Sequence, residues 1–243
     1  MKTDEHSRQA KVVQDGFAII PNVLSEAECE RLIAALKQDA AGTRRERKGS
    51  VYAVRNLLEI AAVRELAQSE MVRQWIVPIL GTEAVAVRGL LFDKTPEANW
   101  NVIWHQDRTV AVKERKEVVG FGAWTEKAGV LHVQPSVVIL EQMLSIRLHL
   151  DPCAMENGVL RVISGTHTRG ILSAADIAAY RENEAAVLLP VECGDAILMR
   201  PLLLHASAPS QSPEHRRVIH LEYACAILPE GLEWHIKIGA NEL

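Results

Sequence analysis

The chain has 243 residues, of which 48% are hydrophobic and 24% are charged, and its formal net charge is −4. This composition is typical of a globular protein with a substantial core, and the length suits one large domain. A weakly acidic chain has no general attraction for nucleic acid or an anionic membrane, so neither partner is expected. The one basic cluster, Arg44–Lys48, is short and contains an acidic residue, which favours a solvated loop over a nucleic-acid patch.

Cysteine usage and the first residues of the chain both favour a cytoplasmic setting. The four cysteines are widely spaced and form no CxxC pair, so we expect free thiols rather than disulfides. Residues 1–8 are polar and lack the apolar core of a signal peptide, and no apolar run approaches the length of a membrane-spanning helix. We therefore predict a cytoplasmic protein, and the sequence does not indicate its oligomeric state.

The first 80 residues are expected to be mainly helical. Ser25 and Glu28 have the spacing of a capping box, in which each side chain satisfies a backbone N–H group at the start of a helix. Pro21 should end the apolar segment before it, because proline cannot donate to a strand ladder. The expected elements are a strand at 17–20 and helices at about 25–37, 56–67 and 70–80.

After Gly81 the pattern changes to short strands punctuated by glycine and proline. The expected strands lie near 83–93, 144–150, 158–163, 187–191, 195–200 and 215–227. Helices followed by many short strands indicate an α+β domain whose second part is a β-sandwich or barrel. We expect a single domain over 1–243, with a helical part at about 1–80 and a mainly β core at about 81–228.

The stretch 108–135 departs from this pattern. It begins with a run of charged residues and then carries three glycines, directly after the His105-Gln106-Asp107 motif. A lid over a binding site would have this composition, and so would an ordinary surface excursion. The sequence leaves both interpretations open.

The His105-Gln106-Asp107 motif is the most informative feature for function, although a His-x-acid pair alone is weak. Three such pairs occur in the chain: His105/Asp107, His149/Asp151 and His220/Glu222. The last two lie within alternating patterns typical of ordinary strands. Only the first pair follows an aromatic residue, Trp104, and leaves enough chain to build several strands before another histidine returns. We therefore favour His105 and Asp107 as metal ligands.

His205 and Arg216 complete a spacing typical of 2-oxoglutarate oxygenases. Two histidine nitrogens and one carboxylate oxygen bind a metal by one face and leave positions open for co-substrate and dioxygen, as in non-haem Fe(II) oxygenases. His205 follows an apolar run and by itself would be interpreted as a core residue. Arg216, eleven residues later, could bind a dicarboxylate through its planar donors. Arg217 competes for this role, but neighbouring strand residues face opposite ways, so only one can serve.

Two predicted strands carry polar residues on one face. Arg216, His220 and Glu222 share a face of one strand, and Arg147 and His149 share a face of another. If these faces point inward, they require a wet or ligand-filled cavity, because buried charges must be paired. If they point outward, they are ordinary solvent-facing surfaces. Two such strands favour the cavity.

Four segments in one order carry a family resemblance: Trp104–Asp107, Glu156–His167, Gly194–His205 and Arg216–Tyr223. Together they resemble the phytanoyl-CoA dioxygenase family of Fe(II)- and 2-oxoglutarate-dependent oxygenases. The opening segment 15–24, followed by a capped helix, is also similar to the family, so the resemblance covers most of the chain. One departure is Ser164, where the family often has proline before the glycine. It affects a turn and no proposed ligand.

The resemblance implies a double-stranded β-helix, that is, a jelly-roll or cupin-like barrel, flanked by N-terminal helices. Fe(II) would be held by His105, Asp107 and His205, and Gln106 would have no chemical role. The implied reaction uses dioxygen and 2-oxoglutarate, releases succinate and CO2, and hydroxylates an unactivated C–H bond. Related halogenases replace the carboxylate ligand with a small residue, so Asp107 favours hydroxylation.

The resemblance also implies that Arg216 binds the distal carboxylate of 2-oxoglutarate. Lys94 and Arg147 are weaker candidates for co-substrate or substrate contacts. Together with Arg108, they suggest a small-molecule substrate that is polar or anionic. Nothing in the sequence marks a coenzyme A site, and the substrate and the position oxidised are not indicated.

Several alternatives stay open at this point. The same iron centre could catalyse desaturation or cyclisation, or the fold could bind metal and 2-oxoglutarate without turnover. A zinc hydrolase with the same ligands is a third alternative, although the sequence offers no obvious general base. Serine-hydrolase and phosphate-binding motifs are absent from the sequence.

Overall fold

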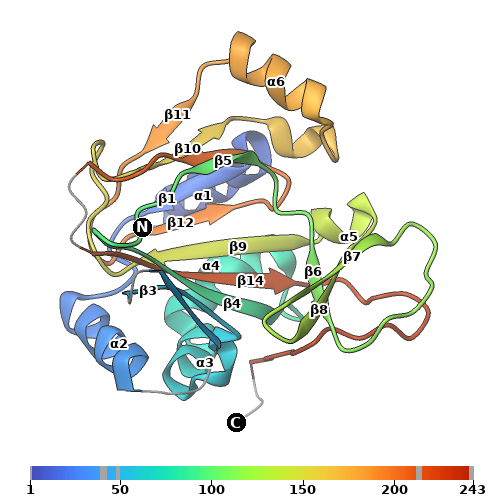
Figure 1. The fold of residues 1–243 in the computed structure, drawn as a ribbon, viewed down its shortest axis with the longest axis horizontal. Coiled ribbons are helices and arrows are strands. Elements are labelled where there is room, and N and C mark those ends of the chain that lie inside the picture. The colour runs from blue at the N-terminus through green and yellow to red at the C-terminus, as the bar shows by residue number, and fades with distance from the viewer. Residues whose placement is uncertain (1, 39–42, 48–49, 212–214, 241–243) are drawn as a thin grey trace.

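The computed structural model describes residues 2–38, 43–47, 50–211 and 215–240, and these form mainly antiparallel sheets with a few helices (Figure 1). The helices are α1 (Lys2–Asp15), α2 (Glu26–Gln38), α3 (Ala61–Gln68), α4 (Glu70–Leu80), α5 (Val137–Glu141) and α6 (Ala174–Asn183). The strands are β1 (Phe17–Ile20), β2 (Thr43–Arg47), β3 (Ser50–Arg55), β4 (Val85–Lys94), β5 (Val102–His105), β6 (Val110–Val112), β7 (Gly122–Lys127), β8 (Val130–Gln134), β9 (Met143–His149), β10 (Leu160–Ile163), β11 (Val187–Leu189), β12 (Ala196–Met199), β13 (Leu204–Ser207) and β14 (Arg216–Ala224).

The strands form three sheets in the described part of the chain. The largest has the order β1-β12-β9-β14-β4-β3-β2, the second β11-β10-β13-β5, and the third β6-β8-β7. In Figure 1 the four-stranded sheet lies over the β1-β12-β9 side of the large sheet. Most neighbouring strands are distant in the sequence, so one cavity is lined by residues from Arg55 to Glu222.

The main hydrophobic core lies between helices and one face of the large sheet. Leu32 of α2, Leu66 of α3 and Ile76 of α4 are buried in one cluster with Ile146 of β9 and Ile219 of β14. Because side chains alternate across a strand, the residues between these apolar positions face the opposite side of the sheet. The helices therefore cover one face and leave the other to the polar residues of the same strands.

A second core lies between the large sheet and the four-stranded sheet. It joins Ile197 and Met199 of β12 to Leu160 and Val162 of β10, all of which are buried. This cluster holds the two sheets together at one end, while polar residues of both sheets face each other beyond it. The space between the sheets is where the candidate site is found.

The predicted capping box is confirmed at the start of α2. The backbone N–H of Ser25 donates to the Glu28 carboxylate over 2.7 Å, and the N–H of Glu28 donates to Ser25 Oγ over 3.3 Å. A similar box begins α6, where Ser173 and Asp176 exchange hydrogen bonds of 2.9 and 3.2 Å. The second box was not used to predict a helix, although its spacing could have identified it.

The first 80 residues are less helical than expected. The predicted helices are present, but residues 43–47 and 50–55 form the β2-β3 hairpin at the edge of the large sheet. The loop expected for the basic cluster is therefore wrong for Arg44–Arg47, while Lys48 lies outside the described residues. Helix α1 was also not predicted. Among its described side chains only Val12 is buried, so the sequence of this helix has no apolar stripe that would have indicated it.

The stretch 108–135 folds as the three-stranded sheet of β6, β7 and β8. Val110, Val112 and Val133 are buried in one cluster with Leu232 and Trp234 of the C-terminal segment. This sheet stands beside the large sheet (Figure 1) and shares its hydrophobic cluster with Val87 and Met143 of that sheet. It is thus a folded element rather than an irregular excursion, and it supplies one side chain, Lys127, to the site.

Among the described residues, no helix is long and apolar enough to cross a membrane. All four cysteines are free thiols, as expected from their spacing. The cytoplasmic location stays a prediction.

Candidate metal centre

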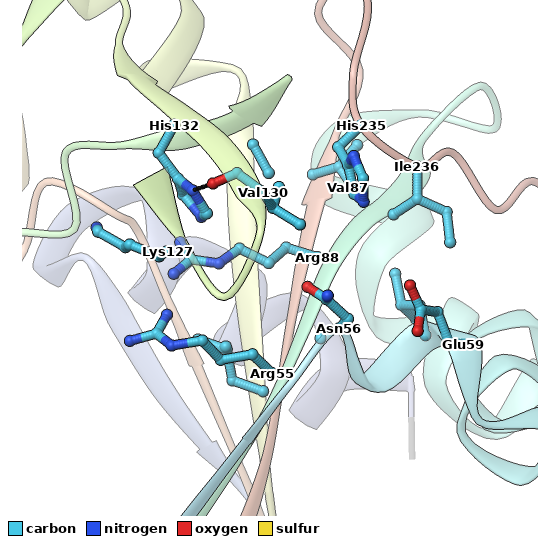
Figure 2. A pocket seen from close by; sticks show the side chains of 14 residues that line it. Arg55, Asn56, Glu59, Val87, Arg88, Lys127, Val130, His132, His235 and Ile236 are labelled. Atoms are coloured by element: carbon cyan, nitrogen blue, oxygen red, sulfur yellow. Dashed lines mark hydrogen bonds between the residues drawn. The ribbon is translucent and has the colours of Figure 1, made fainter. Parts of the chain in front are cut away.

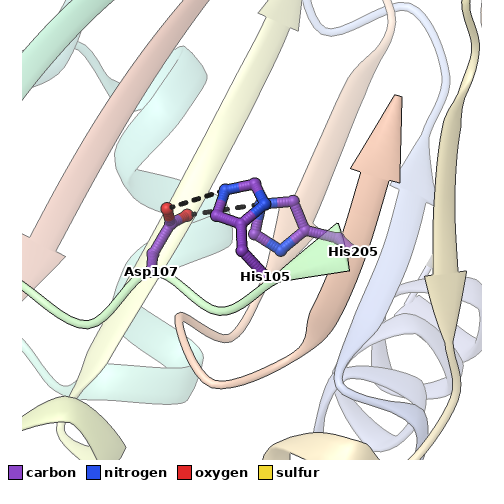
Figure 3. A group of neighbouring side chains, drawn as sticks. All are labelled: His105, Asp107 and His205. Atoms are coloured by element: carbon purple, nitrogen blue, oxygen red, sulfur yellow. Dashed lines mark ion pairs between the residues drawn. The ribbon is translucent and has the colours of Figure 1, made fainter. Parts of the chain in front are cut away.

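Two neighbouring strands of the four-stranded sheet bring the candidate ligands together. His105 is the last residue of β5, and it lies directly opposite His205 of β13 in the strand register. Their ring centroids are 4.2 Å apart. Asp107 follows two residues later, in a loop whose backbone is fixed by its own N–H donating to the Pro201 carbonyl over 2.8 Å. The ligand atoms of the three side chains all lie within 4.8 Å of one another (Figure 3).

The hydrogen bonds of the two histidines point their free nitrogens toward Asp107. His105 Nδ1 lies 2.8 Å from the Ile103 carbonyl, and His205 Nδ1 lies 2.8 Å from the Leu203 carbonyl. A carbonyl only accepts, so each Nδ1 carries the proton and each Nε2 has a lone pair. Both Nε2 atoms lie 3.7 Å from an Asp107 carboxylate oxygen, too far for a hydrogen bond and close to the spacing of donors that share one metal ion.

The electrostatics of the three groups suit a cation. Burial alone would raise the pKa of the Asp107 carboxyl, but His205 and His105 nearby lower it well below its usual range. Burial lowers the pKa of His205 to about 4, against the opposing effect of Asp107. At neutral pH the site therefore holds a carboxylate and a neutral imidazole, which are the forms that bind a metal. The donor set and its protonation both fit a divalent ion.

Gln106 has a structural role, in agreement with its assignment to no chemistry. Its side-chain amide donates to the carbonyls of Gly170 and Leu202 over 2.8 and 2.7 Å, and its carbonyl accepts from the N–H of Leu172 over 2.8 Å. Its side chain points away from the cavity, opposite to the ligands on either side. It ties the ligand loop to the segments that precede α6 and β13.

Arg216 points into the space between the sheets, and Arg217 does not. The Arg216 side chain is 4% exposed and its Nη1 donates to the Gly158 carbonyl and, over 3.1 Å, to Ser207 Oγ. Lys94, its partner in the β4-β14 register, is fully buried and donates to the same hydroxyl over 3.0 Å. Arg217 instead forms an ion pair with Asp151 on the other face.

The pair of cations formed by Lys94 and Arg216 fits a carboxylate ligand. Among the described residues neither side chain forms an ion pair with an acidic group, and Arg216 Nε has no hydrogen-bond partner. Burial and the charge of Arg216 lower the pKa of Lys94 to about 7. Two buried cations held this close favour an anion that would neutralise them. Gly158 matters here because a side chain would collide with the Ala208 carbonyl and the Lys94 ammonium.

The polar faces predicted for β9 and β14 do face a cavity. Arg147 donates to His220 Nδ1 over 3.2 Å, His220 Nε2 lies 3.3 Å from Glu222, and Glu222 accepts from Arg88 over 3.1 Å. This chain of contacts crosses β9, β14 and β4 on the face opposite to the helices. His149 shares the face, but both of its ring nitrogens lack partners and it lies outside the cavity lining.

The cavity between the two sheets has a volume of about 230 Å³. It brings together the three candidate ligands with Arg147 and Arg216, and Lys94 lies just behind it. In the described part of the chain, this triad is the one group of three side chains whose atoms could hold a metal. The rival pairs have other partners, because Asp151 binds Arg217 and Glu222 binds Arg88.

Three cationic residues of the cavity lining were not anticipated: Arg55, Arg88 and Lys127. Arg88 lies in the predicted strand 83–93, and its alternation with Leu90 and Phe92 would have placed all three on one face. Arg55 and Lys127 come from β3 and β7, whose positions the sequence did not reveal. Arg108, suggested as a substrate contact, is exposed at the outer rim beside Asp107.

A family model described as Phytanoyl-CoA dioxygenase (PhyH) matches residues 12–218. The chain belongs to this family. Fe(II), 2-oxoglutarate and dioxygen are the cofactor and co-substrates that the family uses. The human peroxisomal phytanoyl-CoA dioxygenase is 32% identical over 91 residues, an alignment that covers 32% of this chain and 27% of the human protein. The chain thus matches about a quarter of the length of that curated relative.

Solved structures with the same fold include other proteins of the 2-oxoglutarate-dependent class. The apo form of EctD from S. alaskensis has a TM-score of 0.71 at 18% identity, covering 97% of this chain and 84% of that one. AviO1 from Streptomyces viridochromogenes has a TM-score of 0.67 at 23% identity, covering 93% and 97%. The non-haem α-ketoglutarate-dependent epimerase SnoN from nogalamycin biosynthesis has a TM-score of 0.68 at 16% identity, covering 92% and 84%. At these identities the likeness concerns the fold.

Proposed function

We propose that this member of the phytanoyl-CoA dioxygenase family is an Fe(II)- and 2-oxoglutarate-dependent dioxygenase that hydroxylates an unactivated C–H bond of a small molecule. Succinate and CO2 are the other products. The observation that carries the proposal is the convergence of His105, Asp107 and His205 on one cavity that also contains Arg216. Family membership supports it independently.

The metal would be held by His105 Nε2, His205 Nε2 and a carboxylate oxygen of Asp107. Bound iron supplies the activation of dioxygen that an unactivated C–H bond requires. The carbonyls of Ile103 and Leu203 keep both rings in the tautomer that leaves Nε2 free. Ile103 lies in β5 and Leu203 immediately precedes β13, so both partners are backbone atoms beside the sheet and hold the rings in place before any metal arrives.

Arg216 and Lys94 would bind the distal carboxylate of 2-oxoglutarate. Ser207 Oγ accepts a hydrogen bond from both cations and donates its own proton to the Gly158 carbonyl over 2.7 Å, so the three side chains form one rigid group. An anion bound there gains charge-assisted hydrogen bonds in a site shielded from water. Arg147, whose guanidinium stacks 5.8 Å from the Phe92 ring centroid, stays a candidate for a second contact to co-substrate or substrate.

The proposal also covers the type of β fold and the division of the chain into domains. The large and four-stranded sheets would be the two walls of a double-stranded β-helix, with the metal between them. Residues 1–243 would form a single oxygenase domain, with a helical part at about 1–80 and a β core at about 81–228. A cytoplasmic location is consistent with this proposal.

Asp107 favours hydroxylation within this class, since it supplies the carboxylate ligand that halogenases lack. The fold itself does not decide the outcome, because its relatives include an epimerase and a carbocyclase. The product is therefore to be identified by its mass: hydroxylation adds one oxygen atom, whereas desaturation or cyclisation removes two hydrogen atoms.

The experiment that tests the proposal is succinate release from 2-oxoglutarate by purified protein under air, with Fe(II), in the presence and absence of candidate small molecules. We expect succinate only when Fe(II) and dioxygen are both present, and we expect the Asp107→Gly protein to produce none above background. Full succinate release by that variant would remove Asp107 from the metal and contradict the proposal.

Two controls separate the alternatives. Activity with Zn(II) that persists without dioxygen would favour a hydrolase. Tight binding of 2-oxoglutarate with no succinate from any tested molecule would favour a protein that binds these ligands without turnover.

A further inference from the structure

The inner face of β4 has a charge pattern that the metal and the co-substrate do not explain. Its alternate residues are Arg88, Leu90, Phe92 and Lys94, so two apolar side chains separate two cations. The first three line the cavity, and Lys94 is the neighbour of Arg216 described above. The cavity floor thus has a cationic group at each end and an apolar middle.

The two ends are far apart along the sheet. Lys94 pairs with Arg216 and Arg88 pairs with Glu222 in the β4-β14 register. Six residues separate these positions, which corresponds to about 20 Å of extended strand. The five-carbon chain of 2-oxoglutarate is much shorter. We therefore expect a co-substrate bound to Arg216 to leave the Arg88 end of the cavity free.

A second and a third cation stand beside Arg88. Figure 2 shows the charged ends of Arg55, Arg88 and Lys127 side by side and pointing the same way. All three line the same cavity as the metal ligands. Arg88 and Lys127 also border an adjoining pocket with His105 and Asp107, so they face the metal centre from its outer side. We call Arg55, Arg88 and Lys127 the distal cationic cluster.

The acidic residues of the cavity do not balance this cluster. Glu222 is shared between Arg88 at 3.1 Å and His220 at 3.3 Å, and Asp107 belongs to the metal triad. The one hydrogen bond of the Lys127 ammonium among the described residues goes to Thr109 Oγ1 over 3.2 Å, and no carboxylate there lies within ion-pair distance. Burial and the neighbouring arginines lower the pKa of Lys127, which reflects the repulsion between these cations.

We propose that the distal cationic cluster binds an anionic group of the substrate, a carboxylate or a phosphate ester, and that Leu90 and Phe92 contact its carbon skeleton. The anionic group would bind on the opposite side of the metal from Arg216. This position would hold the C–H bond to be oxidised over the metal centre. This inference rests on the proposed oxygenase function and adds the class of substrate to it.

The test compares Lys127→Gln with a control variant, Lys113→Gln. Lys127 is preferred to Arg88 because removing Arg88 would leave Glu222 buried without its cation. Lys113 follows β6 of the same three-stranded sheet, is exposed, and pairs with Glu233 outside the cavity. Both substitutions remove one positive charge from the region of the three-stranded sheet, so a general electrostatic effect would appear in both.

The probes are butyrate, its uncharged analogue butyramide, and ethyl phosphate. Ligand-observed NMR titration gives their Kd values in protein loaded with Zn(II) and 2-oxoglutarate, where no turnover occurs. We expect butyrate or ethyl phosphate, but not butyramide, to bind wild type. Lys127→Gln should weaken this binding about tenfold, and Lys113→Gln should leave it unchanged. Whichever charged probe binds more tightly distinguishes a carboxylate from a phosphate substrate.

Equal binding of butyramide and the charged probes, or charged-probe binding that survives Lys127→Gln, would overturn the inference. The affinity for 2-oxoglutarate, titrated separately, should be the same in Lys127→Gln and wild type. Weaker binding of 2-oxoglutarate by Lys127→Gln would show that Lys127 contacts the co-substrate, and this result would also overturn the inference. If wild type itself failed to bind 2-oxoglutarate, the proposed function would fall, and probe selectivity in the apoprotein would still decide whether the cluster binds anions.

Discussion

His105 and His205 owe their orientation to backbone carbonyl groups two residues before them in the chain. The Ile103 carbonyl belongs to β5 and the Leu203 carbonyl immediately precedes β13, so the rings are held by backbone atoms rather than by side chains that could move away. The His-x-Asp spacing places His105 at a strand end and Asp107 in the loop that follows. The proximity of these two candidate ligands was predictable from the sequence, and their role on the metal stays a prediction.

Gln106 is the residue whose removal should most disturb this arrangement without touching a ligand. Gln106→Ala leaves the buried N–H of Leu172 and two carbonyls without partners. We expect the free energy of unfolding to fall by about 3 kcal/mol. Urea unfolding measures this, with Arg108→Ala as the matched control on the other side of Asp107. That exposed residue should change stability by less than about 0.5 kcal/mol, and equal effects of the two substitutions would refute the structural role of Gln106.

His132 should make stability depend on pH. Burial, followed by the charge of Arg88, lowers its pKa to about 4, whereas an unfolded histidine has a pKa near about 6.5. Between these values the unfolded chain binds a proton that the folded chain does not, so the free energy of unfolding falls as the pH falls. The contribution of His132 to the free energy of unfolding is complete above about pH 6.5 and amounts to at most about 3 kcal/mol.

The measurement is a series of urea titrations from about pH 7 to pH 5 on wild type and His132→Gln. We expect the variant to have a flatter pH dependence in this window. Burial also lowers the pKa values of His149 and His205, which stay in both proteins and contribute to the residual slope. Parallel curves for the two proteins would show that His132 is not the source of the effect.

At the scale of elements, two capping boxes of the same chemistry should have different effects on stability. Helix α2 buries Cys29, Leu32 and Leu36 against the main core, whereas α6 has no buried residue. Ser25→Ala should therefore lower the global free energy of unfolding by about 1 kcal/mol. Ser173→Ala should mainly increase local opening of α6.

Hydrogen exchange followed by mass spectrometry distinguishes the two effects. We expect faster exchange confined to the α6 segment in Ser173→Ala, with a global unfolding midpoint close to that of wild type. If Ser173→Ala lowered the midpoint as much as Ser25→Ala, α6 would be coupled to the core more tightly than its exposure indicates.

Several of the strands that the sequence did not reveal lack a clear local pattern. β5 is exposed or half-buried along its length, and β7 alternates only partly, so neither has the buried run or regular alternation of β9 and β14. The β2-β3 hairpin contains the basic cluster, whose charges resemble a loop in the linear sequence. Pairing with distant strands decides these elements, and such pairing is not visible in local composition.

The distal cationic cluster could not be predicted from local composition either. Arg88 lies in a predicted strand, but Arg55 and Lys127 join it only because β3 and β7 pack around the outer end of the cavity. The family motifs contain the candidate metal ligands and Arg216, whereas the residues proposed to bind the substrate come from elements outside those motifs. This explains why the sequence could suggest a polar or anionic substrate but could not locate the residues proposed here to bind its anionic group.

At the scale of the whole molecule, the proposed single domain predicts one cooperative unfolding transition. The main core joins helices from the first 80 residues to strands as late as β14, so the two parts share one hydrophobic cluster. Denaturant unfolding followed by far-UV and near-UV circular dichroism should give coincident curves. Two separate transitions would show that the helical part and the β core unfold independently.

The central claim is that Fe(II) and 2-oxoglutarate share one site built from the triad and Arg216. The most direct measurement is anaerobic titration of the apoprotein with Fe(II) and then 2-oxoglutarate, following the weak visible charge-transfer band of the chelated co-substrate. We predict the band in wild type and in Arg217→Ala, which changes the outward-facing neighbour, and its loss in His205→Ala and Arg216→Ala. A well-folded wild-type protein that binds Fe(II) without developing the band, or an undiminished band in His205→Ala, would contradict the account.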